Sequence, residues 1–284
     1  METVVSSKTK LYAVIGDPIS HSLSPDIHNR VFREMKLNRN YISLKIQPSY
    51  LKESLSIMKD NFDGFNVTQP HKEKIIPFLE ELDERAKTYG AVNTVKLENN
   101  MYKGYNTDGY GFMRSLEAER INIAGEKVLI LGAGGAARVI AYEMLLIGCK
   151  VTIANRTIEK AQELKKDLMI TTGATNIDVA TLNNIEGSYK IVINTTPIGM
   201  KATLDSMVIE ERLFKNVETA YDLIYNPYKT KFLETAERNG CRILNGFSML
   251  FYQAIKSQEI WMNTTICSSI ATSIFKEIEE SIFK

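Results

Sequence analysis

The chain has 284 residues, of which 44% are hydrophobic and 24% are charged, as in ordinary globular proteins. Its 35 Lys and Arg residues balance 34 Asp and Glu residues, which leaves no basic excess for nucleic acid. No apolar run approaches the roughly 18 to 20 residues that span a bilayer, and the first residues lack the apolar core of a signal peptide. We therefore expect a cytoplasmic protein without nucleic-acid or membrane partners.

Short β-rich runs alternate with helical runs in the N-terminal part of the chain. The predicted strands are 11–15, 41–46, 64–67, 90–97 and 101–105, and the predicted helices between the first three are 25–35 and 49–59. This alternation predicts a parallel or mixed sheet that is covered on both faces.

A second alternation begins near Lys127. The predicted strands are 127–131, 151–154, 191–194, 220–223 and 242–244, and the predicted helices are 136–147, 158–168 and 231–238. After Gly246 the pattern is helical to Lys284. The fold class is therefore α/β, with a doubly wound sheet in the second part.

The segment Gly16–Asn29, GDPISHSLSPDIHN, places Ser20, Ser22 and Ser24 in a loop after a strand. We interpret Ser24 as a helix N-cap and Pro25 as the first helical residue. Hydroxyls beside a helix N-terminus suit a carboxylate or a polyhydroxylated ring. The alternative is that the serines only cap the helix and shape the turn.

A glycine-rich turn, GAGGAA, follows the apolar strand 127–131 and precedes a helix. Gly132 would permit the tight turn, Gly134 would let the backbone approach a pyrophosphate, and Ala137 would allow close helix–strand packing. This context predicts a dinucleotide site, although a glycine-rich turn without a ligand is the alternative.

The end of the next strand indicates which nicotinamide cofactor is bound. An NAD site usually places an acid there for the ribose 2′-OH, whereas this chain shows Asn155, Arg156 and Thr157. Arg156 can pair with a 2′-phosphate, and Lys160 adds a second cation, although Glu159 lies beside it. The predicted cofactor is NADP. The alternative role of Asn155 and Thr157, as helix caps, is compatible with phosphate binding.

Cysteine and histidine usage argues against a disulfide framework and a metal site. The three cysteines are far apart and form no CxxC pair, so we expect reduced, packed thiols. The histidines lack metal-ligand spacing. These residues are Cys149, Cys241 and Cys267, and His21, His28 and His71.

The remaining motifs complete a family pattern. In chain order they are NVTQPHK (66–72), GAVNTV (90–95), GYNTDGYG (104–111), NTTPIGM (194–200), YDLIYNPYKTKFL (221–233) and NGFSMLFYQA (245–254). With the serine segment, the glycine-rich turn and NRT, this series resembles the shikimate dehydrogenase family over nearly the whole chain. The resemblance implies an NADP-dependent oxidoreductase that interconverts 3-dehydroshikimate and shikimate, in the biosynthesis of chorismate and the aromatic amino acids.

The resemblance implies that Lys72 and Asp108 are the catalytic pair. From the residues alone, Lys72 would be a solvated lysine and Asp108 a helix cap. Reduction of a ring ketone leaves an alkoxide that must be protonated, and an ammonium held by a carboxylate can donate that proton or stabilise the charge. Whether Lys72 transfers the proton or only orients and polarises the substrate is left open by the sequence.

The resemblance also implies the binding residues. Those expected to contact the substrate are Ser22, Ser24, Asn66, Thr68, Lys72, Asn93, Asp108, Tyr225 and Gln253. Those expected to contact the cofactor are Gly132, Ala133, Gly134, Gly135, Ala136, Ala137, Asn155, Arg156, Thr157, Lys160, Thr195 and Gly246. Tyr225 as a core aromatic and Gln253 as a surface residue are the alternatives.

The domain organisation follows from the same resemblance. It implies a discontinuous substrate-binding and catalytic domain with a mainly parallel sheet, residues 1–108 and 247–284, onto which the C-terminal helices pack back, and a Rossmann-type NADP-binding domain, residues 109–246. The protein would be a monomer or a homodimer. Two rival functions stay open: a quinate/shikimate dehydrogenase that uses NAD or NADP, and a catalytically silent NADP-binding regulatory protein.

Overall fold

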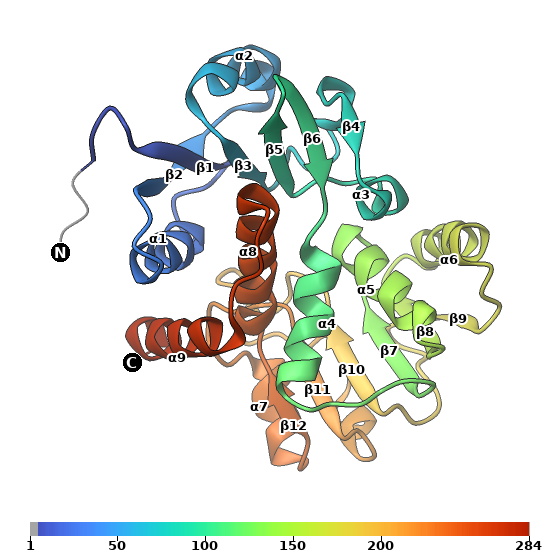
Figure 1. The fold of residues 1–284 in the computed structure, drawn as a ribbon. Helices are drawn as coiled ribbons and strands as arrows, with labels where there is room; N and C mark the ends of the chain where they lie inside the picture. The colour runs from blue at the N-terminus through green and yellow to red at the C-terminus, as the bar shows by residue number, and fades with distance from the viewer. Residues whose placement is uncertain (1–4, 284) are drawn as a thin grey trace. The chain divides into compact units, whose positions relative to one another are not determined.

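The computed structural model describes residues 5–283, and the chain divides into two compact units. The first unit runs up to Gly111 and resumes at Leu250, and the second is Phe112–Met249. In Figure 1 the first unit is therefore drawn from blue to green and again in red, while the second runs from green to orange. The second unit begins and ends three residues later in the chain than the predicted interval 109–246.

The first unit contains a mixed six-stranded sheet in the order β2-β1-β3-β5-β6-β4. β1 pairs in parallel with β2 and β3, and β5 pairs antiparallel with β3 and β6. β4 pairs in parallel with β6. The strands are β1 (Lys10–Gly16), β2 (Arg39–Lys45), β3 (Gly64–Val67), β4 (Glu81–Leu82), β5 (Thr94–Glu98) and β6 (Met101–Tyr105).

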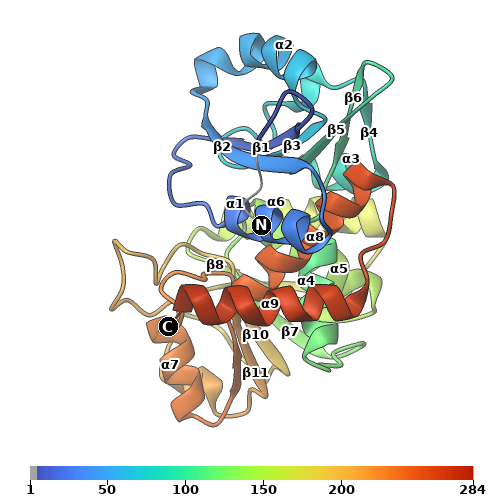
Figure 2. The ribbon, with the colours of Figure 1, turned by 60° about the vertical axis from the view of Figure 1, so that its left-hand side comes forward.

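Helices from both ends of the chain belong to this unit, and Figure 2 shows the C-terminal pair in red. They are α1 (Ser24–Glu34), α2 (Leu51–Asn61), α3 (Glu84–Tyr89), most of α8 (Phe247–Met262) and α9 (Ser268–Phe283), with short 3₁₀ turns at Pro48–Tyr50 and Ile76–Phe78. The indole N–H of Trp261 in α8 donates to the carbonyl of Val95 in β5 at 2.9 Å. α9 contacts α1. The predicted return of the C-terminal helices to the first sheet is therefore confirmed.

The second unit contains an all-parallel six-stranded sheet in the order β9-β8-β7-β10-β11-β12. The direction of winding reverses between β7 and β10, which is the dinucleotide-binding arrangement with its ligand crevice at that point. The strands are β7 (Lys127–Leu131), β8 (Lys150–Asn155), β9 (Ile177–Thr181), β10 (Ile191–Asn194), β11 (Thr219–Asp222) and β12 (Arg242–Leu244). The helices are α5 (Gly135–Leu146), α6 (Ile158–Thr172), α7 (Lys231–Arg238) and most of α4 (Asp108–Ala118), and Glu211–Phe214 is a 3₁₀ turn.

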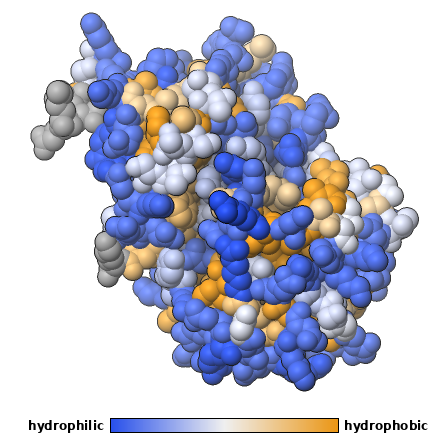
Figure 3. All heavy atoms as spheres, turned by 60° about the horizontal axis from the view of Figure 1, so that its bottom comes forward, coloured by the Kyte–Doolittle hydropathy of each residue, from blue (hydrophilic) through white to orange (hydrophobic). Residues whose placement is uncertain are grey.

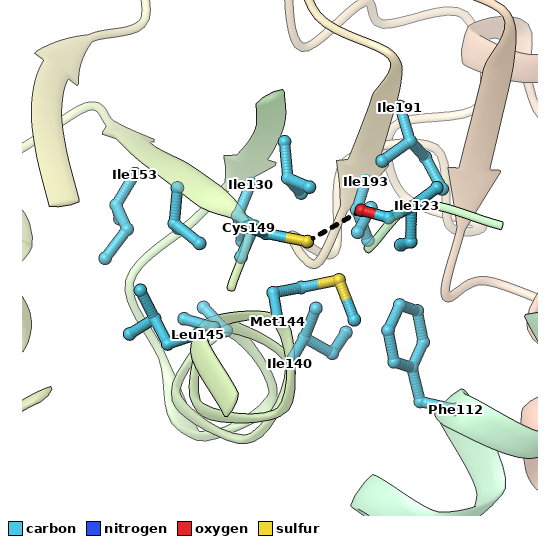
Figure 4. Packing of buried hydrophobic residues seen from close by; sticks show 14 of the residues in the cluster. Phe112, Ile123, Ile130, Ile140, Met144, Leu145, Cys149, Ile153, Ile191 and Ile193 are labelled. Carbon is cyan, nitrogen blue, oxygen red and sulfur yellow. Dashed lines mark hydrogen bonds between the residues drawn. The ribbon is translucent and has the colours of Figure 1, made fainter. Parts of the chain in front are cut away.

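Successive residues along the strands of the second sheet point to opposite faces and pack into two separate hydrophobic cores. In β7, Val128 and Ile130 pack with α4, α5 and α6, whereas Leu129 and Leu131 pack with α7. Figure 4 shows the first of these cores, in which the thiol of Cys149 donates to the carbonyl of Ile123 at 3.0 Å. Because both faces are covered, the central strands β7 and β10 are almost wholly buried and mainly apolar, as in a buried parallel sheet.

Three predictions of local structure need correction. The strand predicted over 90–97 begins at Thr94, because Gly90, with φ +65°, ends the unpredicted helix α3 in the left-handed region. α1 begins at Ser24 itself, and no side chain caps it, so Ser24 is not the N-cap. Cys149 and Cys241 are buried as expected, but Cys267 is exposed.

Hydrophilic side chains cover most of the face shown in Figure 3, with small apolar areas between them. Within residues 5–283, no helix has the length and apolarity that a membrane crossing would need.

Candidate active site

Lys72 and Asp108 form an ion pair in the first unit. Lys72 follows β3, and its backbone carbonyl accepts from the N–H of Val92 at 2.8 Å, which fixes its loop beside the segment that leads into β5. Asp108 is the first residue of α4. The Lys72 Nζ lies 2.6 Å from Asp108 Oδ2, and the side chains are 31% and 17% exposed. The pair is therefore partly shielded from water and still accessible to a ligand.

Asn93 holds the other oxygen of the same carboxylate. Its Nδ2 donates to Asp108 Oδ1 at 2.8 Å, while its Oδ1 accepts from the backbone N–H of Thr107 at 2.9 Å. The Oε1 of Gln253 in α8 lies 3.3 Å from Asn93 Nδ2. Four of the predicted substrate residues, Lys72, Asn93, Asp108 and Gln253, thus come together from four separate segments.

Asn66, at the end of β3, is buried behind this group. Its Oδ1 accepts from the hydroxyl of Tyr41 at 2.7 Å, and its Nδ2 lies 3.0 Å from the Asn93 carbonyl and 3.0 Å from the hydroxyls of Thr94 and Ser257. Burial raises the pKa of Tyr41 well above its ordinary value, so the phenol stays a donor. The protein itself therefore fills the hydrogen-bonding positions of Asn66.

The predicted serine contacts lie in the loop before α1. The Ser22 hydroxyl accepts from the backbone N–H of Ser24 at 3.2 Å, and Ser24 is buried while Ser22 is half-buried. Thr68 packs its methyl group against Gly16, where an added Cβ would lie 2.5 Å away. These three side chains belong to the same unit as the ion pair, and the Ser24 side chain also hydrogen-bonds Tyr41 in β2.

The glycine-rich turn between β7 and α5 lies in the second unit. Gly132 has φ +111°, and a Cβ there would lie 2.5 Å from the hydroxyl oxygen of Thr195. A Cβ at Gly134 or Gly135 would meet nothing within 4 Å. The turn thus needs glycine at Gly132 for its own geometry, whereas the space beside Gly134 and Gly135 is open. Such an exposed backbone at the start of a helix fits a pyrophosphate.

The loop after β8 presents the predicted phosphate contacts. Arg156, Thr157 and Lys160 are exposed, and Asn155 Nδ2 donates to the carbonyl of Thr157 at 2.8 Å. Thr157 occupies the N-cap position of α6 without a side-chain hydrogen bond to the helix. The alternative role of Thr157 as a side-chain cap is therefore absent from the structure. Two exposed cations at a helix N-terminus suit a 2′-phosphate.

Three further predicted residues line the ends of β10, β11 and β12. The Thr195 hydroxyl donates to the carbonyl of Leu131 at 2.7 Å. Tyr225 is half-buried after β11, and burial raises the pKa of its phenol, so it stays a hydroxyl. A Cβ at Gly246 would collide with the carbonyl of Leu223, so glycine is required there for packing.

The sequence interpretation missed several members of the polar group around Asn93. They are Tyr41, Thr94, Thr107 and Ser257. Ser257 lies one helical turn after Gln253, so a shared helix face was a usable signal. Thr94 and Thr107 lie inside the motifs GAVNTV and GYNTDGYG, directly beside Asn93 and Asp108. The pairing of Tyr41 with Asn66 depends on the sheet register and had no local signal.

The chain matches two family descriptions in succession. Residues 14–95 match "Shikimate dehydrogenase substrate binding domain", and residues 115–218 match "Shikimate / quinate 5-dehydrogenase". The chain belongs to the shikimate dehydrogenase family. Among curated relatives, the shikimate dehydrogenase (NADP(+)) of Carboxydothermus hydrogenoformans is 43% identical over 265 residues, which cover 90% of this chain and 93% of the relative.

Solved structures of the family agree with this assignment. A shikimate dehydrogenase crystallised in complex with NADP+ has a TM-score of 0.91 and 34% identity, covering 97% of this chain and 98% of that one. Shikimate 5-dehydrogenase from Listeria monocytogenes, crystallised with shikimate and NAD, has a TM-score of 0.88 and 32% identity, covering 96% and 97%. Among the described residues of the present chain, no group of three or more His, Cys, Asp or Glu side chains is placed to hold a metal ion.

Proposed function

We propose that this chain is an NADP-dependent shikimate dehydrogenase in which Lys72 and Asp108 handle the substrate proton. It is an oxidoreductase of the shikimate pathway, which reversibly reduces 3-dehydroshikimate to shikimate. The observation that carries the assignment of roles is the ion pair at 2.6 Å, whose carboxylate is also held by Asn93. A catalytically silent binding protein would have no need of this arrangement.

The chemistry divides between the cofactor and the side chains. When bound, NADP supplies or accepts the hydride. Reduction of the ring ketone requires a proton at the carbonyl oxygen, and oxidation requires its removal from the hydroxyl. The Lys72 ammonium donates a hydrogen bond to that oxygen and stabilises the negative charge that develops on it. Asp108 fixes the ammonium in place through its second oxygen.

The remaining polar groups bind the rest of the substrate. Asn93 and Asp108 contact ring hydroxyls, and Gln253 lies beside them in α8. The hydroxyls of Ser22 and Ser24 bind the carboxylate, for which neutral donors beside a helix N-terminus are suited. Thr68, Asn66 and Tyr225 complete the proposed substrate set. Asn66 would act indirectly, by supporting Asn93, because its amide is already hydrogen-bonded within the protein.

The cofactor would lie against the second unit. The turn Gly132–Ala137 would receive the pyrophosphate, and the fit is supported by the open backbone at Gly134 and Gly135. Arg156 would pair with the 2′-phosphate, helped by Asn155, Thr157 and Lys160. Thr195 and Gly246 would shape the neighbouring loops.

A second candidate function is a dual quinate/shikimate dehydrogenase that accepts NAD or NADP. It is favoured by the description "Shikimate / quinate 5-dehydrogenase" matched by residues 115–218 and by the NAD in the Listeria monocytogenes complex. It would require the substituents at C1 of quinate to fit beside Ser22 and Ser24.

Four assays separate these functions. Purified protein is mixed with shikimate or quinate, each with NADP+ or NAD+, and the absorbance of the reduced cofactor is followed. We expect shikimate with NADP+ to react fastest by a wide margin. Comparable rates with quinate or NAD+ would favour the dual enzyme, and four flat traces would favour the silent binding protein. A monomer or homodimer and a cytoplasmic location remain predictions.

A further inference from the structure

Thr94, the first residue of β5, lies at the centre of the polar group and is fully buried. Its hydroxyl oxygen is 2.9 Å from Asn93 Oδ1, 3.0 Å from Asn66 Nδ2 and 2.8 Å from the hydroxyl oxygen of Ser257. It is thus the only side chain in the described structure that contacts both Asn66 Nδ2 and Asn93 Oδ1.

Ser257 approaches the same point from α8 and is also fully buried. Its hydroxyl oxygen lies 3.0 Å from the backbone carbonyl oxygen of Gln253 and accepts from Asn66 Nδ2 at 3.0 Å. Ser257 therefore joins the helix that carries Gln253 to the strand ends that carry Asn66 and Asn93.

Thr94 and Ser257 carry one hydroxyl hydrogen each, and one of these two hydrogens must lie in the 2.8 Å contact between them. Either Ser257 donates to Thr94, which then donates to Asn93 Oδ1, or Thr94 donates to Ser257, which then donates to the Gln253 carbonyl. Asn66 Nδ2 then donates to the hydroxyl pair and to the Asn93 backbone carbonyl. Each hydroxyl in this arrangement has both a donor and an acceptor role.

The groups around Oδ1 decide which end of the Asn93 amide faces Asp108. Oδ1 accepts from the Thr107 N–H and lies 2.9 Å from the Thr94 hydroxyl oxygen, so Nδ2 is turned toward Asp108 Oδ1 at 2.8 Å. A rotated amide would place its oxygen against the carboxylate and leave a buried donor without a partner, which is costly. The carboxylate that holds Lys72 depends on this orientation.

We propose that Thr94 and Ser257 are positioning residues, which set the orientation of the Asn93 and Asn66 side-chain amides and thereby hold Asp108 opposite Lys72. The proposal rests on the proposed function. Neither hydroxyl is placed in contact with substrate or cofactor, because both are buried behind Asn66 and Asn93. Their effect should therefore appear in the use of shikimate and not in the binding of NADP+.

Three substitutions test the pair in the full-length protein. Thr94→Val removes the hydroxyl at nearly constant shape, Ser257→Ala removes the other, and the double variant removes both. We expect Thr94→Val to lower kcat/KM for shikimate about 10- to 100-fold, because a buried network loses its central hydroxyl. Ser257→Ala should lower it a few-fold. Since the two hydroxyls contact each other, the double variant should lose less than the product of the two effects.

Two controls separate positioning from a general loss of stability. Thr94→Ser keeps the hydroxyl and deletes a methyl group, so it should keep kcat/KM within about threefold although the cavity costs stability. Ser115→Ala removes a buried hydroxyl of the second unit, which lies 2.7 Å from the Tyr221 hydroxyl, and should lower the thermal midpoint with kcat/KM unchanged. The dissociation constant of NADP+, from a binding titration, should stay within about twofold in every variant.

Equal losses in Thr94→Val and Thr94→Ser, or a Thr94→Val enzyme with wild-type kcat/KM, would overturn the proposal. Inactivity of the wild-type protein on shikimate would instead overturn the proposed function. In that case the crystal structure of Thr94→Val decides. An Asn93 amide turned away from Asp108 supports the positioning role, and an unchanged Asn93–Asp108 hydrogen bond contradicts it.

Discussion

We propose that single charged residues perform separate tasks in the two units. In the first unit, Lys72 is paired and partly shielded, which suits a group that must hold and move a proton. In the second unit, Arg156 and Lys160 are exposed after β8, which suits recognition of a phosphate that arrives from solvent. The separation of the two tasks makes them independently testable by substitution.

Arg156→Ala tests the recognition of the 2′-phosphate. A guanidinium makes charge-assisted, bidentate hydrogen bonds to phosphate, each worth about 1.5 to 3 kcal/mol. We expect KM for NADP+ to rise and the preference for NADP+ over NAD+ to narrow about 10- to 100-fold. The measurement is kcat and KM for both cofactors at fixed ionic strength, because exposed charges are screened by salt.

Lys160→Ala is the matched control for that measurement, because it removes a cation at the same helix N-terminus but offers no fork of donors. It should narrow the preference less than Arg156→Ala does. If the wild-type enzyme already prefers NAD+, or if Arg156→Ala raises both KM values equally, the assignment of the 2′-phosphate to Arg156 is wrong.

At the scale of single elements, the β7–α5 turn contains a glycine that the backbone conformation does not require. Gly134 has φ −94°, which any residue adopts, and a Cβ there would meet no protein atom within 4 Å. The protein alone gives no reason for glycine at this position. The reason we infer is the close approach of a pyrophosphate to the backbone.

Gly134→Ala should therefore weaken NADP+ binding by about tenfold or more while leaving the thermal midpoint within about 1 °C, because only the ligand meets the new methyl group. Gly125→Ala should instead lower the thermal midpoint and leave NADP+ binding unchanged. Gly125 has φ +76° and open space around it, so the substitution strains the backbone by about 1 kcal/mol without touching the cofactor site. Unchanged NADP+ affinity in Gly134→Ala would remove the turn from the cofactor site.

Periodicity and turn residues predicted most strands and helices of both units, because apolar runs bounded by glycine are strong local signals. They missed β4, which has two residues, β9, in which Asp178 is exposed and the next three residues are partly buried, and α3, which is a helix of six residues. The meeting of Lys72 with Asp108 had no local signal, since the two are brought together by sheet pairing. Only the family resemblance predicted that pair, whereas the residues of the glycine-rich turn and of the loop after β8 predicted the cofactor site by themselves.

At the scale of the whole molecule, Asp222 links three segments at the carboxyl edge of the second sheet. Its carboxylate accepts from the Thr230 hydroxyl at 2.6 Å, from Asn194 Nδ2 at 3.0 Å and from the Ile224 N–H at 3.1 Å. These partners are all neutral. Burial raises the pKa of Asp222 from 3.8 to about 6, and the three hydrogen bonds oppose this shift.

This raised pKa predicts a pH dependence of stability. Between pH 4 and 6 the folded protein keeps a proton that the unfolded chain has lost, so the stabilisation present at pH 4 disappears as the pH rises through 6. A shift of two pKa units corresponds to about 3 kcal/mol. Relative to Asp222→Asn, the wild-type free energy of unfolding should therefore fall from pH 4 to pH 7.

Urea unfolding followed by circular dichroism measures this difference. The single tryptophan, Trp261, lies in the first unit, so its fluorescence does not report on the sheet that contains Asp222. A wild-type protein that gains stability over Asp222→Asn as the pH rises would show that the three donors outweigh burial.

The central claim is that Lys72 handles the substrate proton, and one comparison tests it most directly. Steady-state oxidation of shikimate by NADP+ is measured for the wild type, for Lys72→Ala and for Lys74→Ala, in which an exposed lysine two residues away is removed. We predict that Lys72→Ala lowers kcat about 10² to 10⁴-fold with the dissociation constant of NADP+ unchanged, and that Lys74→Ala stays near the wild type. A Lys72→Ala enzyme with near-normal kcat would contradict the account.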